Sequence, residues 1–509
     1  MSHRALYGQF HGKTDSVQPR VGDGTSVAVL CAGITAANMQ PSIFNVRVPL
    51  KERDDVFLLN TLTDAQLIVS SDVADLLNRT SFESLTDSER EAIQLLMENG
   101  FFVDDSASDR RALDEYFHTI KHSSEELHIT VLTTLQCNFA CGYCYQGDRE
   151  DFNQFAEKMT LETSARVAGW IEQELDRLQP AKFAMTFFGG EPLLNLPVMY
   201  DLADRMWAAT QARGIPQSLS VITNGLLLTT DIVDHLNARG LRGIKVTLDG
   251  DRATHDRMRP LRGGQGTFDR IIENIRKVAG RTRISIGGNF DETSADSFPA
   301  LLDFLKEQEF FDRLVKVNFK PIVRDQPPVP TVKKGMLPLI PVNEHGKPLG
   351  GSCMTSVGGG GGSTCDKCSF LDEKMVFLRE ETRRRGLPTV SGVPVGPCHV
   401  HQVNAHTIGP DGSLYGCPGF TGEKAMSTGH IDGRSESWRN RNRTRFETLD
   451  PWAQCGDCAF IPTCAGGCLT ASFAQLGDVN TPTCHKSTFE SAVIALAQRV
   501  ASEQQETVQ

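Results

Sequence analysis

The chain has 509 residues, of which 45 are glycine, and 39% of its residues are hydrophobic. This composition is typical of a globular protein, and the length suffices for several domains, so a disordered, collagen-like or coiled-coil chain is excluded. The 52 basic residues are outnumbered by 63 acidic ones, which gives a net charge of −11. We therefore expect no nucleic-acid partner, because a protein that binds the phosphate backbone over a wide face is normally basic.

Fourteen cysteines are the strongest signal in the composition. The first residues lack the continuous apolar segment of a signal peptide, and no run of about 18 apolar residues occurs that could span a membrane. We therefore expect a cytoplasmic protein with no membrane partner. Disulfides are rare in that reducing compartment, so clustered cysteines indicate metal ligands or redox groups.

The N-terminal part predicts a small domain after a flexible arm at 1–40. Three short alternating runs predict an antiparallel meander, and Thr86 with Glu89 has the capping-box pattern of a helix that ends at Gly100. Residues 41–105 are therefore predicted to form a winged-helix-like α+β domain, with a linker helix at 106–126. The alternative is a purely structural cap. The meander runs lie at 43–50, 56–61 and 65–70.

From residue 127 onward, strand and helix patterns alternate six times. This alternation predicts the α/β class, with the parallel sheet of a partial (β/α)6 TIM-like barrel over 127–325. Polar, glycine-containing motifs follow the second, third and fourth strands, at the ends where such folds carry their chemistry. The predicted strands are 127–136, 182–190, 218–225, 243–250, 283–290 and 315–323, with amphipathic helices such as 160–178 and 267–278 between them.

The C-terminal part has little apolar periodicity. Residues 326–397 are predicted to be a Pro- and Gly-rich insertion that contains a helix at 371–385. Residues 398–490 are rich in cysteine and glycine and are predicted to form an iron–sulfur domain that needs metal to fold. A helix or tail at 491–509 completes the chain.

Cys137, Cys141 and Cys144 form a CxxxCxxC motif directly after the first barrel strand. Three thiolates can hold three irons of a [4Fe–4S] cube, which normally takes four, so one iron is left open to an outside ligand. A zinc site fits less well, because zinc prefers four closed ligands at a different spacing.

Over residues 127–325, this motif and those after the next strands resemble the radical S-adenosylmethionine (radical SAM) superfamily. The resemblance implies that Cys137, Cys141 and Cys144 ligate the cluster and that S-adenosylmethionine binds its open iron. It also implies that reductive cleavage of this cofactor yields a 5′-deoxyadenosyl radical, which abstracts hydrogen from the substrate. The hard chemistry would then belong to the cofactors.

Further positions match the superfamily residue by residue. Gly189, Gly190 and Glu191 resemble the GGEP motif, in which glycine lets the backbone approach the methionyl ammonium and a carboxylate pairs with it. Thr223 and Asn224 resemble ribose or carboxylate contacts, and Tyr143 resembles the aromatic residue near the adenine. A stretch shared with one subgroup adds Asp249, His255 and Arg259, although His255 also fits a surface loop.

Seven further cysteines and Gly412 resemble the SPASM domain, which holds two auxiliary [4Fe–4S] clusters in enzymes that modify peptides and proteins. Two zinc sites are the alternative. Carried over by position, three cysteines ligate auxiliary cluster I and four ligate auxiliary cluster II, for three clusters in all. An open iron in cluster I could bind a substrate thiolate. The ligands of cluster I are Cys398, Cys417 and Cys468, and those of cluster II are Cys455, Cys458, Cys464 and Cys484.

Four other cysteines and three histidines are harder to assign. Cys365 and Cys368 form a CxxC near five consecutive glycines, and with Cys353 they could supply a cluster ligand, bind a further metal or form a redox pair. Cys31 is expected to be incidental, and His399, His401 and His406 are expected to be ordinary loop residues.

We therefore predict a radical SAM/SPASM oxidoreductase that matures a ribosomal precursor peptide by a cross-link, such as a thioether, or by an oxidation. Residues 41–105 resemble the recognition element of enzymes that modify such peptides, which captures a leader peptide by strand addition. A flavodoxin- or ferredoxin-type protein would donate electrons. The alternatives are a sulfatase-type maturase, a quinoprotein maturase or an enzyme for a carrier-derived small molecule, and, outside enzymes, an iron–sulfur electron carrier or zinc scaffold.

Overall fold

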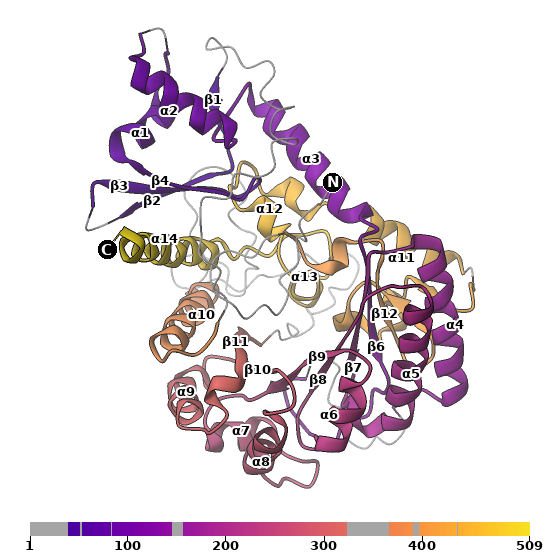
Figure 1. The fold of residues 1–509 in the computed structure, drawn as a ribbon. Helices are drawn as coiled ribbons and strands as arrows, with labels where there is room; N and C mark the ends of the chain where they lie inside the picture. The colour runs from indigo at the N-terminus through magenta and orange to yellow at the C-terminus, as the bar shows by residue number, and fades with distance from the viewer. Residues whose placement is uncertain are drawn as a thin grey trace, which may run out of the picture.

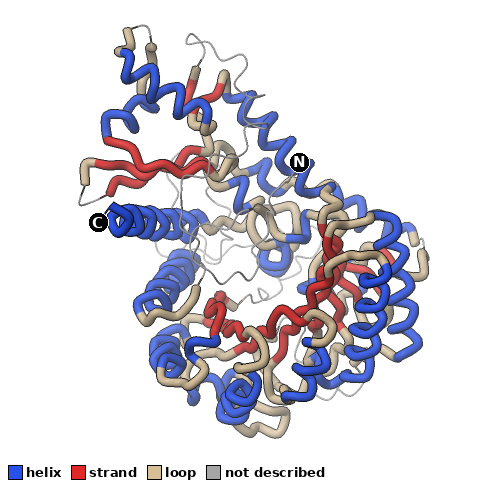
Figure 2. The backbone as a smooth tube through the Cα atoms, viewed as in Figure 1, coloured by secondary structure: helices blue, strands red, loops and turns tan. Residues whose placement is uncertain are grey.

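The computed structural model describes residues 39–50, 53–82, 84–144, 156–322, 366–389, 396–434 and 436–508. Within these ranges the chain forms a small N-terminal α+β unit, a partial barrel and a C-terminal unit (Figures 1 and 2). The predicted arm lies outside the described residues up to residue 38. None of the described helices is long and apolar enough to cross a membrane.

The N-terminal unit is the predicted meander followed by helices. The strands β2 (Asn45–Leu50), β3 (Asp55–Asn60) and β4 (Ala65–Ser70) pair antiparallel in chain order. The helices that follow are α1 (Ser71–Asp75), α2 (Asp87–Glu98) and α3 (Ser106–His122), and β1 (Gln40–Pro41) pairs with β5 (Phe102–Val103). The capping box is confirmed, since Glu89 N donates to Thr86 Oγ1 and Thr86 N to the Glu89 carboxylate.

Both faces of this three-stranded sheet are covered. Side chains alternate along β3, so Val56 and Leu58 pack with α1 and α2, whereas Phe57 and Leu59 face the C-terminal helix α14 (Lys486–Val508). Val493 of α14 contributes to this second cluster with no exposed surface. The end of the chain is therefore part of the core beneath the N-terminal sheet (Figure 1).

The barrel contains the six predicted parallel strands. They lie in chain order, and their buried residues pack in one large core with the surrounding helices, which cover the outer face of the sheet (Figure 2). Its elements are β6 (Glu126–Leu132), α4 (Leu161–Leu178), β7 (Lys182–Phe188), α5 (Leu196–Ala212), β8 (Gln217–Thr223), α6 (Thr230–Asn237), β9 (Leu241–Thr247), α7 (Arg252–Met258), α8 (Phe268–Val278), β10 (Ile284–Phe290), α9 (Phe298–Lys306) and β11 (Leu314–Pro321).

The C-terminal unit extends the barrel sheet, which the sequence did not predict. The strand β12 (Ala405–Ile408) pairs parallel with β6, and β13 (Ser413–Tyr415) and β14 (Gly429–His430) follow antiparallel. The sheet therefore has nine strands among the described residues. The helices of this unit, besides α14, are α10 (Asp366–Arg384), α11 (Ser437–Glu447), α12 (Ile461–Cys464) and α13 (Leu469–Leu476).

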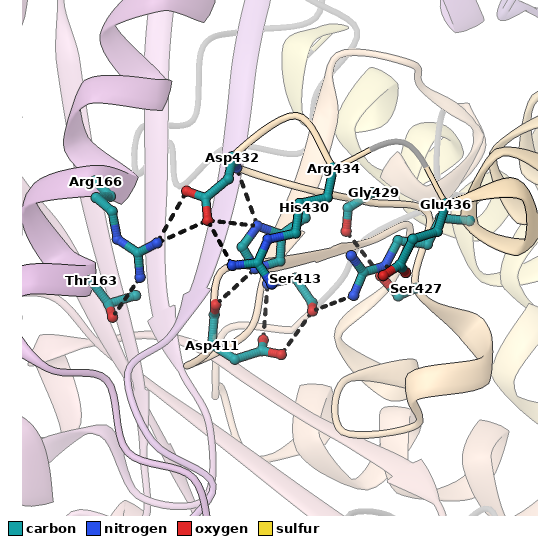
Figure 3. Close-up of polar contacts among 11 residues, drawn as sticks. Thr163, Arg166, Asp411, Ser413, Ser427, Gly429, His430, Asp432, Arg434 and Glu436 are labelled. Atoms are coloured by element: carbon teal, nitrogen blue, oxygen red, sulfur yellow. Dashed lines mark hydrogen bonds and ion pairs between the residues drawn. The ribbon is translucent and has the colours of Figure 1, made fainter.

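A polar network fastens this extension to the barrel (Figure 3). Arg166 of α4 donates from Nη1 to both carboxylate oxygens of Asp432, at 3.1 and 2.9 Å. Asp432 also pairs with Arg434 at 3.2 Å, and the ring of His430 connects Asp432 N to the carbonyl of Asp411. The β13–β14 region is therefore tied to the first barrel helix by side chains as well as by the β6–β12 ladder.

Candidate functional site

The CxxxCxxC cysteines lie in the loop after β6. Cys137 and Cys141 are half-buried and Cys144 is exposed. Burial and, to a smaller extent, the charges of Glu191 and Cys141 raise the pKa of the Cys137 thiol to about 12. Burial also raises the pKa of Cys141, where Arg259 opposes the effect and Cys144 adds to it. The three thiols therefore lie close enough to influence one another.

The residues between these cysteines are held by a short stretch after α7. Ala140 N donates to the carbonyl of Pro260 at 2.9 Å, and Arg262 N donates to that of Asn138 at 3.2 Å. Arg262 Nε also donates to the carbonyl of Cys137 at 3.0 Å. The loop conformation is therefore fixed by protein contacts on the side of the fourth strand.

Gly189 and Gly190 are required by the backbone that precedes Cys137. Gly190 N donates to Thr134 O at 2.9 Å, and Glu191 N donates to Gln136 O at 2.8 Å. A Cβ on Gly190 would lie 2.5 Å from the carbonyl carbon of Gln136, and Gly189 has a φ of +140°, where L side chains are rare. The two glycines thus accommodate the backbone that leads into Cys137, and their contact with the cofactor stays a prediction.

Glu191 connects the ends of the second and third strands. Its carboxylate has no exposed surface and accepts hydrogen bonds from Thr223 Oγ1 at 2.7 Å, Asn224 N at 2.8 Å and Leu193 N at 3.1 Å. Burial raises the pKa of this carboxyl group, and these hydrogen bonds oppose the rise. The Asn224 amide donates in turn to Asn138 Oδ1 at 2.7 Å and so reaches the cysteine loop.

Tyr143, Asp249 and Arg259 form a second buried group. The Tyr143 hydroxyl donates to Asp249 Oδ2 and accepts from Arg259 Nη1 at 2.6 Å. Asn289 N donates to Asp249 Oδ1 at 2.7 Å, which adds the end of the fifth strand. Arg259 is 8% exposed, and its Nε has no hydrogen-bond partner among the described residues.

His255 is a buried support and not a surface residue. It has no exposed surface, its Nδ1 accepts from Asp249 N at 3.1 Å, and its Nε2 lies 3.1 Å from Thr267 Oγ1. Burial lowers its pKa well below the usual value, and the charge of Arg259 lowers it further. Its ring is therefore neutral and orients the turn that carries Asp249.

The donor set fits a thiolate-ligated cluster. Half-buried thiols with raised pKa values need a metal to ionise at neutral pH, and the charge of the Arg259 guanidinium near Cys141 compensates thiolate charge. Among the described side chains, no three His, Cys, Asp or Glu groups converge on one ion. A cube does not require such convergence, since each thiolate binds a different iron.

The C-terminal cysteines lie in two sets, one of three and one of four. The thiolates of Cys398 and, more weakly, Cys468 act on Cys417, whose pKa burial raises to about 11. The other four cysteines lie close together. Burial and, to a smaller extent, the charges of Cys455, Cys458 and Cys484 raise the pKa of Cys464 to about 12. Thr483 N donates to Gly466 O at 2.9 Å, and Cys468 N donates to Thr483 Oγ1 at 3.2 Å. These bonds connect Gly466 and Cys468, a cysteine of the first set, to Thr483, the residue directly before Cys484 of the second set.

The remaining candidates lie elsewhere or outside the described residues. His399 packs edge-on against His128, His401 against Trp452 and His406 against Trp170, so the three are packed residues and not free loop side chains. Cys31, Cys353 and Cys365 lie outside the described residues. Cys368 falls in the first turn of α10, in the part of the helix whose side chains are not described.

Sequence reasoning missed Asn138 and Asn289. Both hydrogen-bond directly to residues predicted as cofactor contacts. Their only signal in the sequence is their position, beside a cysteine ligand and at the end of a barrel strand. With these two residues, side chains from the ends of β6, β7, β8, β9 and β10 meet at one edge of the sheet.

Residues 131–305 match the family model described as the radical SAM superfamily. This part of the chain is a radical SAM domain, and the [4Fe–4S] cluster and S-adenosylmethionine that the superfamily implies fit the cysteine loop. Among solved structures, native anSMEcpe with bound AdoMet has a similar fold, with a TM-score of 0.52. The two sequences are 16% identical, and the match covers 74% of this chain and 99% of that one. The same protein with AdoMet and the Kp18Cys peptide gives a TM-score of 0.53 at 14% identity, over 75% of this chain and 99% of that one.

Curated relatives match only part of this chain. An uncharacterized protein of Methanothermobacter thermautotrophicus is 30% identical over 29% of this chain and 50% of its own length. The Fe-coproporphyrin III synthase of Methanosarcina barkeri is 26% identical over 38% of this chain and 44% of its own length. A GTP 3′,8-cyclase of Xanthomonas campestris is 34% identical over 32% of this chain and 44% of its own length. The chain thus spans half or less of the length of these relatives.

Proposed function

We propose that this protein is a radical SAM/SPASM enzyme that modifies a peptide. The observation that carries the proposal is the convergence of the Cys137–Cys144 loop with two buried polar groups, one around Glu191 and one around Asp249, at the end of the barrel strands. When bound, the cluster and S-adenosylmethionine would supply reductive cleavage of the sulfonium and hydrogen abstraction from the substrate.

The chain's own residues would position these groups. Cys137, Cys141 and Cys144 would hold the cluster, and Tyr143, Asp249 and Arg259 would form one wall of the cofactor site. Glu191 would act through Thr223 and Asn224, since its oxygens accept their hydrogen bonds. Burial of these groups keeps water from the place where a reactive radical would form.

Two auxiliary [4Fe–4S] clusters are proposed in the C-terminal unit. The separation of the cysteines into a set of three and a set of four supports this assignment. The set of three would leave an iron of cluster I open, and a substrate thiolate could bind there, which would suit formation of a thioether. An electron left by that reaction would pass to an auxiliary cluster.

A peptide substrate is supported by two observations. The fold is similar to that of anSMEcpe, a solved structure of which contains AdoMet and the Kp18Cys peptide. In addition, β4 is an edge strand among the described residues, and an edge strand can accept an extended peptide by backbone hydrogen bonds. We propose that β4 captures the leader of the precursor peptide.

The first test compares the unmutated protein with Cys137→Ala and with the matched control Cys31→Ala, which changes a cysteine of no assigned role. After anaerobic reconstitution and reduction with S-adenosylmethionine, we expect 5′-deoxyadenosine from the unmutated protein and the control only. Equal product from all three proteins would refute the radical assignment and favour an electron carrier or zinc scaffold.

The second test identifies the substrate. The triple variant Cys137→Ala, Cys141→Ala and Cys144→Ala is purified anaerobically from the native host, and captured molecules are weighed by mass spectrometry. We expect a short peptide, and we expect the β4 amides to exchange hydrogen more slowly in its presence than in its absence. A captured protein of enzyme size would favour the sulfatase-type or quinoprotein alternative, and unchanged exchange would reject capture at β4.

A further inference from the structure

The inner face of the barrel sheet carries three lysines that the proposed chemistry does not use. Along β9, Ile244 and Val246 point into the core beneath the outer helices, so Lys245 between them points to the opposite face. The same alternation on β11 places Val317 in the core and Lys316 and Lys320 on the inner face. This concave face is turned away from the helices, toward the centre of the molecule (Figures 1 and 2).

The strand register brings these lysines together. Ser285 of β10 pairs with Lys245 on one side and with Lys316 on the other, so the three residues form one row across the sheet. Lys320 pairs with Asn289, farther along toward the C-terminal edge. Asn289 contacts Asp249, so this end of the lysine group reaches the proposed cofactor site.

The side chain of Lys245 extends along the sheet over a glycine. A Cβ built on Gly287 would collide with Lys245 Cε and would lie 3.1 Å from its Nζ. Gly287 is two residues beyond Ser285, toward the same C-terminal edge. The missing side chain at Gly287 therefore leaves the space in which the Lys245 ammonium lies.

No counter-charge accompanies these ammonium groups among the described residues. Burial and, to a smaller extent, the charges of Lys320 and Lys316 lower the pKa of Lys245 to about 8. The two carboxylates at this end of the sheet, Glu191 and Asp249, accept hydrogen bonds from other groups. In the same row, Ser285 is 3% exposed, and its Oγ is buried without a hydrogen-bond partner among the described residues.

We propose that Lys245, Lys316, Lys320 and Ser285 bind a carboxylate of the peptide substrate, and so select a peptide with an acidic group beside the residue that is attacked. This inference rests on the proposed peptide substrate. Lys245 is partly buried, and Lys316 and Lys320 are exposed. Neighbouring cations repel one another, and an anion between them removes that repulsion. A buried hydroxyl without a partner completes an anion site, because it can donate to a carboxylate oxygen.

The test measures how fast each lysine is dimethylated by formaldehyde and cyanoborohydride in the full-length, reconstituted protein, by peptide mass spectrometry. Lys277, which is exposed on α8 and paired with Glu273, is the internal reference. The probes are acetyl-Ala-Asp-Ala-amide, its Asn counterpart, acetyl-Ala-Ala with a free carboxylate, S-adenosylmethionine alone and GTP alone.

We expect the Asp probe to slow modification of Lys245 and Lys316 about fivefold relative to the Asn probe, which corresponds to about 1 kcal/mol of charge attraction. Protection by acetyl-Ala-Ala as well would mean that a chain terminus also fits the site. In the variant Lys245→Gln with Lys316→Gln, the Asp probe should no longer protect Lys320.

Equal effects of the Asp and Asn probes would overturn the proposal. Protection by S-adenosylmethionine alone would assign the lysines to the cofactor, and protection by GTP but not by the Asp probe would assign them to a nucleotide. Binding of these probes needs no turnover, so the 5′-deoxyadenosine assay on the same preparation reports separately on the proposed function.

Discussion

Replacing Gly190 by alanine tests whether the glycine pair serves the cysteine loop. The new Cβ would lie 2.5 Å from the carbonyl carbon of Gln136 and 2.7 Å from the carbonyl oxygen of Leu135, whereas real Cβ contacts essentially never fall below 3.0 Å. The backbone that leads into Cys137 must therefore move by at least 0.5 Å to open the first of these contacts. Both contacts involve backbone, so no flexible side chain can relieve them.

We expect this overpacking to lower the free energy of unfolding by about 1–3 kcal/mol. The displaced loop should also lower the rate of S-adenosylmethionine cleavage, by up to about 100-fold, since a misplacement of about 1 Å can have that effect. The measurements are urea unfolding, iron content after anaerobic reconstitution and the rate of 5′-deoxyadenosine formation.

Gly169→Ala is the matched control. Gly169 lies inside α4, and a Cβ there would meet nothing within 4 Å. Alanine is the better helix former, so this variant should gain about 0.5–1 kcal/mol and keep full activity. If Gly190→Ala were as stable and as active as Gly169→Ala, the argument that the glycines accommodate the backbone of the cysteine loop would be wrong.

Two further predictions concern buried groups. Glu191→Gln should lower the free energy of unfolding by about 1–3 kcal/mol. An amide NH2 would replace one carboxylate oxygen, and each oxygen now accepts a hydrogen bond, one from Thr223 Oγ1 and the other from Asn224 N. A free energy of unfolding equal to that of the unmutated protein would contradict this prediction. His406 packs against Trp170, and its pKa is lowered to about 4 mainly by burial. Because His406 binds a proton more readily in the unfolded chain than in the folded one, the stability that the neutral ring contributes is lost as the pH falls from about 6.5 through 4. Between pH 7.5 and pH 5, the free energy of unfolding measured in urea should fall less in His406→Gln than in the unmutated protein. Equal falls in the two proteins would contradict the claim that buried, neutral His406 contributes to this pH dependence.

Periodicity in the sequence was enough to locate the barrel strands. Each predicted strand overlaps an observed one, and the extra residues at several predicted C-terminal ends are the site loops. Strands of this kind are long and apolar on one face, so their pattern is strong. The strands β12, β13 and β14 have four residues or fewer, and such short runs carry almost no periodic signal.

The polar partners in the site could not be predicted in the same way. That Glu191 would accept hydrogen bonds from the Thr223–Asn224 loop depends on how two strand ends meet, which no local pattern encodes. The burial of His255 has the same origin, because only the fold brings its ring against Asp249 and Thr267. The row of Lys245 and Lys316 became visible only when strand register joined residues from β9 and β11 through Ser285.

The packing of α14 beneath the N-terminal sheet couples distant parts of the chain thermodynamically. This helix begins at Lys486, two residues after Cys484, and its Val493 and Leu496 are buried against Phe57 and Leu59. A ligand that binds only the folded sheet stabilises everything that folds with it. Occupancy of the sheet edge by the proposed peptide and retention of the cluster proposed at Cys484 would therefore be linked equilibria, each strengthening the other.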